Sequence, residues 1–305
     1  MTRVSDLKPM PLRMVTRTSE EAPLPPHIPA GSVPFPDAVP LISLSRAIRR
    51  WLRRALLRSG KRFRVPRLLV VQGPPGTGKT WTVLNTAAAT HNVATYPAAS
   101  LLAGVEGAHI EALEAWMQGL VTLSRATGKP SLGLLDDADV ILSRPESMQT
   151  TINQAGGDVW LMTLADRHDL HVNVDGTPIR LVLCGNSYER TRSAVLRDGR
   201  AEIVTHAPTL EERIAVAQQS LGVSTETERS LVAETVTAFA DEPLALWPAV
   251  AADLDNQRLD AALDQHGDDD AAIERVLAYP VALTREALSH AIVARLTSGR
   301  ARNFL

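Results

Sequence analysis

The sequence of 305 residues predicts an α/β fold in which a doubly wound parallel sheet is followed by a smaller α-helical domain. Short apolar runs that suit buried parallel strands alternate with helical patterns as far as Pro208. A glycine-rich loop directly follows the first of these runs, and beyond Pro208 every apolar pattern has helical spacing. The chain is longer than a usual single domain, which agrees with two folded parts.

The first part of the chain, residues 1–40, is predicted to be an extended and partly disordered arm. It carries nine of the 20 prolines, and proline lacks the backbone donor that helices and sheets need. We expect the α/β domain to span residues 41–208 and the helical lid domain to span residues 209–305.

The expected elements follow in order along the chain. A basic amphipathic helix over 43–58 comes first, with apolar side chains three and four residues apart. Apolar runs at 68–71, 132–135 and 179–183 predict strands, with helices between them. The helices expected after Pro208 lie near 210–221, 225–240, 249–264 and 283–296. The acidic residues 268–270 are interpreted as a solvated loop.

The glycine-rich loop satisfies the pattern GxxxxGK[ST] in full and lies between a strand and a helix, as a phosphate-binding loop requires. Its residues are Gly73, Pro74, Pro75, Gly76, Thr77, Gly78, Lys79 and Thr80. The backbone amides close around the phosphates, Lys79 reaches the β and γ phosphates, and Thr80 binds Mg²⁺. The sequence therefore predicts a P-loop NTPase that takes ATP and Mg²⁺. Trp81, directly after the loop, lies either near the nucleotide or in packing.

Polar residues at the ends of the next two predicted strands complete the expected site. Asp136 and Asp137 follow the strand at 132–135, where a P-loop enzyme holds its metal ion and the attacking water. We expect Asp136 to contact Mg²⁺ and Asp137 to act as the base. Asn186 follows the strand at 179–183 and is expected to orient the water between the γ phosphate and the carboxylates.

Two arginines three residues apart, Arg197 and Arg200, come next. In ring-forming ATPases this region faces the nucleotide of the adjacent subunit, where an arginine stabilises the charge of the transition state. We therefore assign both to catalysis in a neighbouring subunit. Taken without this context, two arginines near a glycine would be a solvated turn.

The order of these motifs resembles the AAA+ ATPases, and the stretch 100–213 resembles the core of Rubisco activase of the plant and cyanobacterial type. The segment 104–107 is similar to that family's pore loop, and 150–153, 161–162 and 165–166 are similar to its segment after the Walker B strand. The blocks 184–186, 196–200 and 207–213 resemble its sensor 1, arginine-finger and linker motifs.

This resemblance implies a homo-oligomeric ring, expected to be hexameric, that uses ATP hydrolysis to remodel a client protein through a central pore. Arg197 and Arg200 would then act in the neighbouring subunit. We carry over this mechanism and leave the client unassigned. The family's lid-domain arginine, known as sensor 2, has no counterpart near residues 246–249.

Two other functions compete with protein remodelling. A nucleic-acid-associated ATPase or loader would use the basic segment 46–67, although the apolar face around Trp51 also fits a helix packed beside the nucleotide site. The basic residues are Arg46, Arg49, Arg50, Arg53, Arg54, Arg58, Lys61, Arg62, Arg64 and Arg67. An ATP-gated scaffold or switch with little hydrolysis would explain the aspartate at 137 and the missing sensor 2 arginine.

The composition limits the possible partners, the disulfide content and the expected location of the protein. The formal net charge of −2 gives no global attraction to nucleic acid or anionic membrane. The single cysteine, Cys184, cannot form an internal disulfide. Neither a signal peptide nor a membrane-spanning run is expected, so we predict a cytoplasmic protein with no membrane partner.

Overall fold

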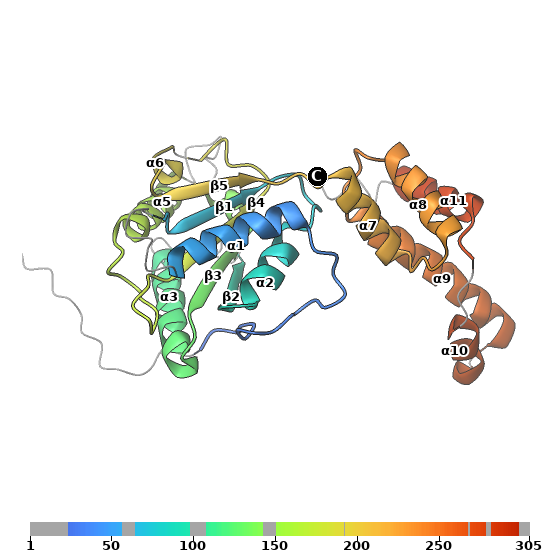
Figure 1. Ribbon diagram of the computed structural model, residues 1–305, viewed down its shortest axis with the longest axis horizontal. Helices are drawn as coiled ribbons and strands as arrows, with labels where there is room; N and C mark the ends of the chain where they lie inside the picture. The colour runs from blue at the N-terminus through green and yellow to red at the C-terminus, as the bar shows by residue number, and fades with distance from the viewer. Residues whose placement is uncertain are drawn as a thin grey trace, which may run out of the picture.

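The computed structural model describes residues 24–56, 65–97, 108–142, 151–191, 193–267, 269–278 and 282–298. Its centre is a five-stranded parallel sheet with the strand order β2-β3-β4-β1-β5 (Figure 1). The strands are β1 (Leu68–Gln72), β2 (Asn92–Pro97), β3 (Ser131–Asp136), β4 (Arg180–Gly185) and β5 (Ala201–Thr205). The predicted α/β class with a P-loop sheet is confirmed.

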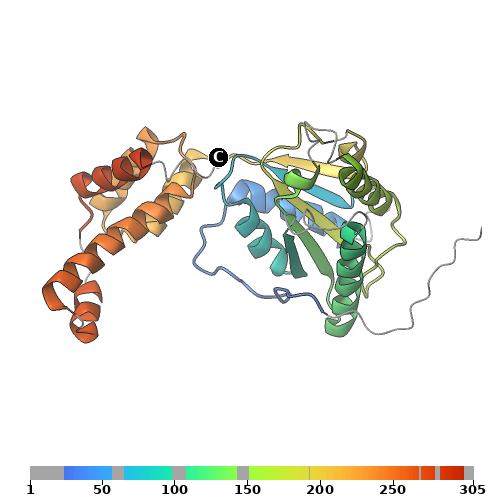
Figure 2. The ribbon, with the colours of Figure 1, turned by 180° about the vertical axis from the view of Figure 1, so that it is seen from behind.

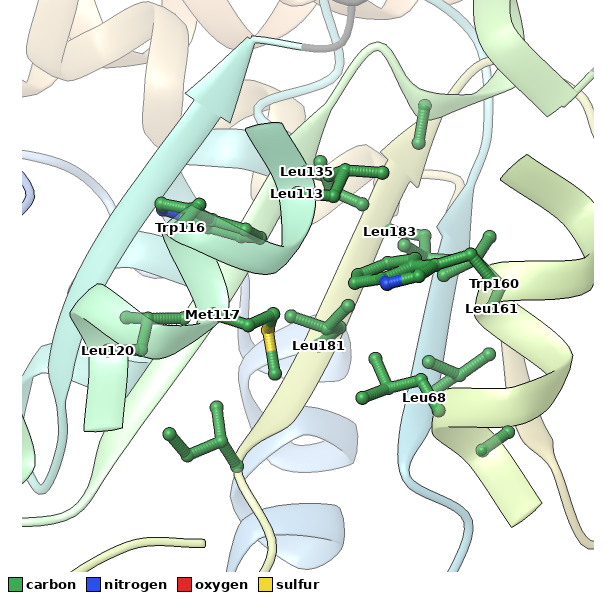
Figure 3. Packing of buried hydrophobic residues seen from close by; sticks show 14 of the residues in the cluster. Leu68, Leu113, Trp116, Met117, Leu120, Leu135, Trp160, Leu161, Leu181 and Leu183 are labelled. Atoms are coloured by element: carbon green, nitrogen blue, oxygen red, sulfur yellow. The ribbon is translucent and has the colours of Figure 1, made fainter. Parts of the chain in front are cut away.

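One face of the sheet is covered by α3 (Ala108–Thr127) and α5 (Thr151–Asp166). Figure 3 shows Trp116 and Met117 of α3 and Trp160 of α5 packed over Leu68 and Leu181 of the strands. Side chains alternate between the two faces along a strand, so Leu68 and its second neighbour Val70 belong to this cluster.

The opposite face is covered by α1 (Ile42–Leu56) and α2 (Lys79–Ala88). Leu69 and Val71, the alternate residues of β1, pack there with Ile48 and Trp51 of α1. Helices on both faces explain why the central strands read as continuous apolar runs. The short helices α4 (Ala138–Leu142) and α6 (Ser193–Leu196) follow β3 and precede β5 respectively.

After β5 the regular elements of the described residues are all helices, and they form a separate lobe (Figures 1 and 2). They are α7 (Leu210–Ser220), α8 (Glu226–Ala238), α9 (Leu246–His266), α10 (Asp270–Ala278) and α11 (Arg285–Thr297). Their core includes Val232, Trp247, Leu288 and Ile292. Capping boxes at Thr209 and Thr225 fix where α7 and α8 begin.

Residues 24–40 of the proline-rich segment lie against the α/β part. Ile28 forms an antiparallel bridge with Val93 of the edge strand β2, with N–O distances of 2.8 and 2.9 Å. The side chain of Asn85, on α2, exchanges two hydrogen bonds with the backbone of Phe35, at 3.0 and 2.9 Å. The rest of the arm, residues 1–23, lies outside the described residues.

The sequence analysis missed several elements, among them β2, β5 and α10. Strands β2 and β5 lie at the edges of the sheet and are partly exposed, so their apolar signal is weak. The acidic run after Gly267 was interpreted as a loop, but Asp270 begins α10. Among the described residues, no helix is long and apolar enough to cross a membrane.

Arg67 corrects the predicted basic surface. Its side chain is fully buried and donates hydrogen bonds to the carbonyl oxygens of Leu164, Arg167, Leu170, His171 and Ile179. Burial lowers the pKa of its guanidinium to about 10, which leaves it charged at neutral pH. Arg67 therefore anchors the segment after α5 and cannot contact phosphates in solution.

Candidate nucleotide site

The candidate site lies where the central parallel strands end. Gln72 at the end of β1 is in register with Gly185 at the end of β4, and β3 ends next to them at Asp136. The carboxyl ends of parallel strands form the edge at which open α/β sheets bind ligands. The loop 73–78 crosses this edge and leads directly into α2.

The glycines of the loop satisfy steric requirements. A Cβ on Gly73 would lie 2.1 Å from the carbonyl oxygen of His206, so no side chain fits there. Gly78 has a φ of 77°, a left-handed conformation that glycine adopts without strain. Gly76 also has a positive φ, and its carbonyl accepts a 3.1 Å hydrogen bond from the amide of Ala245. Thr77 donates to the carbonyl of Pro74 at 2.8 Å.

The ammonium group of Lys79 is held inside the loop. Its Nζ donates to the carbonyl oxygens of Gly73 and Pro74, both at 2.8 Å, and to Oδ1 of Asn186 at 3.3 Å. Burial lowers the pKa of Lys79 from its ordinary value, and the nearby aspartates oppose that shift. A polyphosphate would offer this partly desolvated cation a stronger partner than two neutral carbonyls.

The two residues predicted to hold Mg²⁺ are in direct contact. Thr80 Oγ1 donates a 2.8 Å hydrogen bond to Oδ1 of Asp136. A hydroxyl and a carboxylate are hard oxygen donors, the kind Mg²⁺ binds together with substrate phosphates. The donor set thus fits this ion, and the glycine cradle of the loop fits the phosphates.

Asp137 lines the cavity beside Asp136 and has a φ of 53°, a left-handed conformation that costs a non-glycine residue about 1–2 kcal/mol. Burial raises the pKa of its carboxyl, and the charges of Asp136 and Asp139 add to that rise. A raised pKa makes this carboxylate a stronger base. Strain at a cavity residue is a common feature of functional sites.

Asn186 lies opposite the loop, immediately after β4. Its Oδ1 accepts from Lys79, and its carbonyl accepts a 3.2 Å hydrogen bond from the amide of Gly73. The structure therefore brings Asn186, Lys79, Thr80, Asp136 and Asp137 around one cavity of about 1070 Å³.

Residues 69–209 match the sequence profile of the family described as "ATPase family associated with various cellular activities (AAA)". This stretch of the chain is therefore similar to AAA domains. It contains every predicted site residue from Gly73 to Arg200.

A curated relative of the chain is the "ATP-dependent zinc metalloprotease FtsH" of Methylococcus capsulatus. The two are 26% identical over 227 residues, which cover 71% of this chain and 34% of the relative. The chain thus spans about a third of the length of that protein.

The two predicted catalytic arginines, Arg197 and Arg200, do not line the cavity of their own chain. Neither is among the described residues that line it. Arg200 donates through Nε to Oδ1 of Asp166 at 2.8 Å, through Nη2 to Oδ2, and through Nη1 to the carbonyl of Ala194 at 2.6 Å. Arg197 has a 60% exposed side chain and only a 4.0 Å contact with Asp166. Sequence reasoning treated the two as equivalent, whereas the structure gives them different surroundings.

Several lining residues were not predicted as part of the site. They come from the segment before α1 and from the helical part, and include Val39, Leu41, Leu244, Ala245 and Pro248. These residues are apolar, so no polar motif in the sequence could reveal them. They form walls suited to an aromatic base beside the polar phosphate loop.

Trp81 is 56% exposed and lines the same cavity. Its ring stacks on Phe35, with centroids 4.3 Å apart and an angle of 15° between the planes. Trp81 therefore packs on a neighbour and also borders the cavity, and its contact with a nucleotide stays a prediction. The predicted pore-loop segment 104–107 lies outside the described residues.

Proposed function

We propose that the chain binds Mg·ATP in this cavity and hydrolyses it. The observation that carries the proposal is the meeting of Lys79 with Asn186 and of Thr80 with Asp136 at one sheet edge. Lys79 and Thr80 begin α2 after the loop that follows β1, whereas Asp136 ends β3 and Asn186 follows β4. Each supplies the chemistry that phosphoryl transfer needs at that place.

The contacts of Lys79 and Thr80 indicate how the nucleotide would bind. Lys79 would exchange the carbonyls of Gly73 and Pro74 for the β and γ phosphates, which compensate its charge better. Thr80 and Asp136 would hold Mg²⁺, which neutralises negative charge on the phosphates. The base would lie between the segment 39–41 and the residues around Ala245, beside the ring of Trp81.

The hydrolytic step uses the residues that face Lys79. Asp137 would take the proton of the attacking water, and its raised pKa suits that role. The amide of Asn186 would orient the water, because its oxygen already lies within 3.3 Å of Lys79 Nζ. Aspartate is one methylene shorter than glutamate, so we expect slow turnover.

Assembly into a homo-oligomeric ring, expected to be hexameric, is the second part of the proposal. Arg197 is exposed and lies outside its own cavity, which supports a role at the nucleotide of a neighbouring subunit. Arg200 is engaged by Asp166, which supports a role in shaping the loop that carries Arg197. Hydrolysis would then depend on assembly.

A protein is the proposed client of this ring. Two resemblances support a client of this class: the motif order similar to Rubisco activase, and the relative whose name describes an ATP-dependent protease. Proteolysis does not follow from that name, because the chain spans only 34% of the relative.

An ATP-gated switch with little hydrolysis is the alternative that an observation favours. From residue 209 onward, the described residues that line the cavity are Val216, Gln219, Ser220, Leu244, Ala245 and Pro248. None of these is a cation, which agrees with the missing sensor 2 arginine.

The nucleic-acid hypothesis is weakened by the surroundings of three basic residues. Arg67 is buried and cannot contact a phosphate, and Arg50 and Arg54 form ion pairs with Glu202.

Isothermal titration calorimetry of the purified chain with Mg·ATP tests the binding proposal. We expect saturable binding that Lys79→Ala removes, with an unchanged melting temperature for the variant. Binding of equal strength to both proteins would place the nucleotide elsewhere and contradict the proposed site. A gel shift with DNA or RNA at low salt tests the nucleic-acid alternative, which an absent shift would eliminate.

A further inference from the structure

A third aspartate, Asp139, lies just beyond the pair Asp136 and Asp137. Unlike that pair, it is not among the described residues that line the cavity. Its Oδ2 accepts hydrogen bonds from the backbone amides of Asn186 at 2.8 Å and Ser187 at 3.3 Å. The carboxylate thus joins the start of α4 to the chain that leaves β4.

Gly185 makes this contact sterically feasible. A Cβ at that position would lie 2.6 Å from Oδ1 and 2.7 Å from Cγ of Asp139. It would also lie 2.8 Å from the hydroxyl of Tyr188. A side chain at 185 would require the carboxylate of Asp139 and the hydroxyl of Tyr188 to move, so the present contact of Asp139 with the two amides depends on Gly185.

The backbone around Asn186 is consequently held from two sides. Asp139 accepts from its amide, and the amide of Gly73 donates to its carbonyl at 3.2 Å. Between these two anchors the Asn186 side chain reaches Lys79. A hydrogen bond from a backbone amide to a carboxylate is stronger than one to a neutral acceptor, so Asp139 supplies the firmer anchor.

We infer that Asp139 is a positioning residue for ATP hydrolysis, which acts by fixing the backbone that aims the Asn186 side chain at the γ phosphate. This inference rests on the proposed function. Asp139 lies outside the described cavity lining, and its contacts reach the site through the backbone amides of Asn186 and Ser187. Its charge also contributes, after burial and Asp136, to the raised pKa of Asp137. Its removal should therefore slow the chemical step more than it weakens ATP binding.

A double-mutant cycle on steady-state phosphate release tests the inference. Asp139→Ala should lower kcat about tenfold or more, with a change of less than about threefold in KM for ATP. In the Asn186→Ala background the same substitution should change kcat by less than about twofold, because the residue to be positioned is gone. Equal fold-losses in both backgrounds would overturn the inference.

A matched control separates positioning from general loss of a carboxylate. Asp175 also accepts from a backbone amide, that of Thr177 at 2.9 Å, in a loop outside the described cavity lining. Asp175→Ala should leave kcat unchanged. Asp139→Asn keeps one acceptor oxygen and should recover part of the lost kcat, whereas an asparagine variant as slow as the alanine variant would count against positioning.

A substitution at Gly185 tests the same contact between Asp139 and the backbone amides without changing Asp139 itself. Gly185→Ala removes no charge but displaces the carboxylate of Asp139, so it should lower kcat with little effect on KM. If Asp139→Ala does not fold, Gly185→Ala can take its place in the test. Gly185→Ala with wild-type kcat would contradict the inference. If the wild-type chain hydrolyses no more ATP than Lys79→Ala, both the proposed function and the inference are wrong. If the wild type is active but Asp139→Ala and Asn186→Ala lower kcat independently of each other, only the inference is wrong.

Discussion

Thr80 Oγ1 donates a 2.8 Å hydrogen bond to Oδ1 of Asp136, although the two residues are 56 positions apart in the sequence. Thr80 is the second residue of α2, the helix after β1, and Asp136 ends β3. The contact shows that the phosphate loop and the acidic strand end share one site, which spacing alone could only suggest.

Thr80→Val should weaken ATP binding about tenfold when magnesium is present and leave it nearly unchanged in EDTA. Valine keeps the shape of threonine but removes the oxygen that would bind Mg²⁺. Calorimetric titrations with ATP under both conditions measure the difference. An equal loss of affinity with and without magnesium would assign Thr80 to another role.

Arg197→Ala should lower the hydrolysis rate about a thousandfold and preserve ATP binding, since an arginine supplied in trans acts on the transition state. Arg197→Lys should recover little, because lysine lacks the planar fork of donors. Phosphate release and nucleotide affinity, measured on the same preparations, separate the two effects. An Arg197→Ala variant with wild-type turnover would remove this residue from catalysis.

Arg200→Ala should instead lower thermal stability as well as turnover. The substitution leaves the carbonyl of Ala194 and the carboxylate of Asp166 without their donor. The hydrogen bonds from Arg200 lower the pKa of Asp166, so this pair is ionic. Differential scanning calorimetry of the Arg197→Ala and Arg200→Ala variants side by side provides the comparison, and equal melting temperatures would contradict the division of roles.

The fluorescence of Trp81 should change when nucleotide binds. Its ring is 56% exposed at the cavity and stacks on Phe35, so a bound base would alter its exposure to water. The signal of the wild type should shift on addition of Mg·ATP, and most of that shift should be absent in Trp81→Phe. A full shift in the Trp81→Phe variant would assign the change to another tryptophan.

Acidification should destabilise the α/β part through His91. Burial, helped by the charge of Arg180, lowers the pKa of His91 to about 4, below its ordinary value of 6.5. The unfolded chain therefore binds more protons between these values, and stability falls as the pH drops from 6.5 toward 4. By linkage, the free energy of unfolding is lower at pH 5 than at pH 7 by about 2 kcal/mol. Urea denaturation at pH 7 and pH 5 should show a smaller loss for His91→Gln than for the wild type; equal losses would exclude His91 as the cause.

The sequence predicted the central strands because both of their faces are buried, as at Leu69 and Val70. It missed β5, where Glu202 and Ile203 are partly exposed at the sheet edge. The polar residues of the site carried clear motifs. Its apolar walls did not, since residues such as Leu244 become part of a cavity only through the tertiary fold. The sequence places Asp139 beside the predicted metal-binding aspartates, but it could not predict that the amides of Asn186 and Ser187 donate to this residue.

Steady-state phosphate release by the wild type, Lys79→Ala and Asp137→Asn tests most directly whether this cavity hydrolyses ATP. We predict a slow but measurable wild-type rate with magnesium and no rate above background for either variant. Of the two variants, only Asp137→Asn should still bind ATP. Equal background rates in all three proteins would show that this cavity does not hydrolyse ATP.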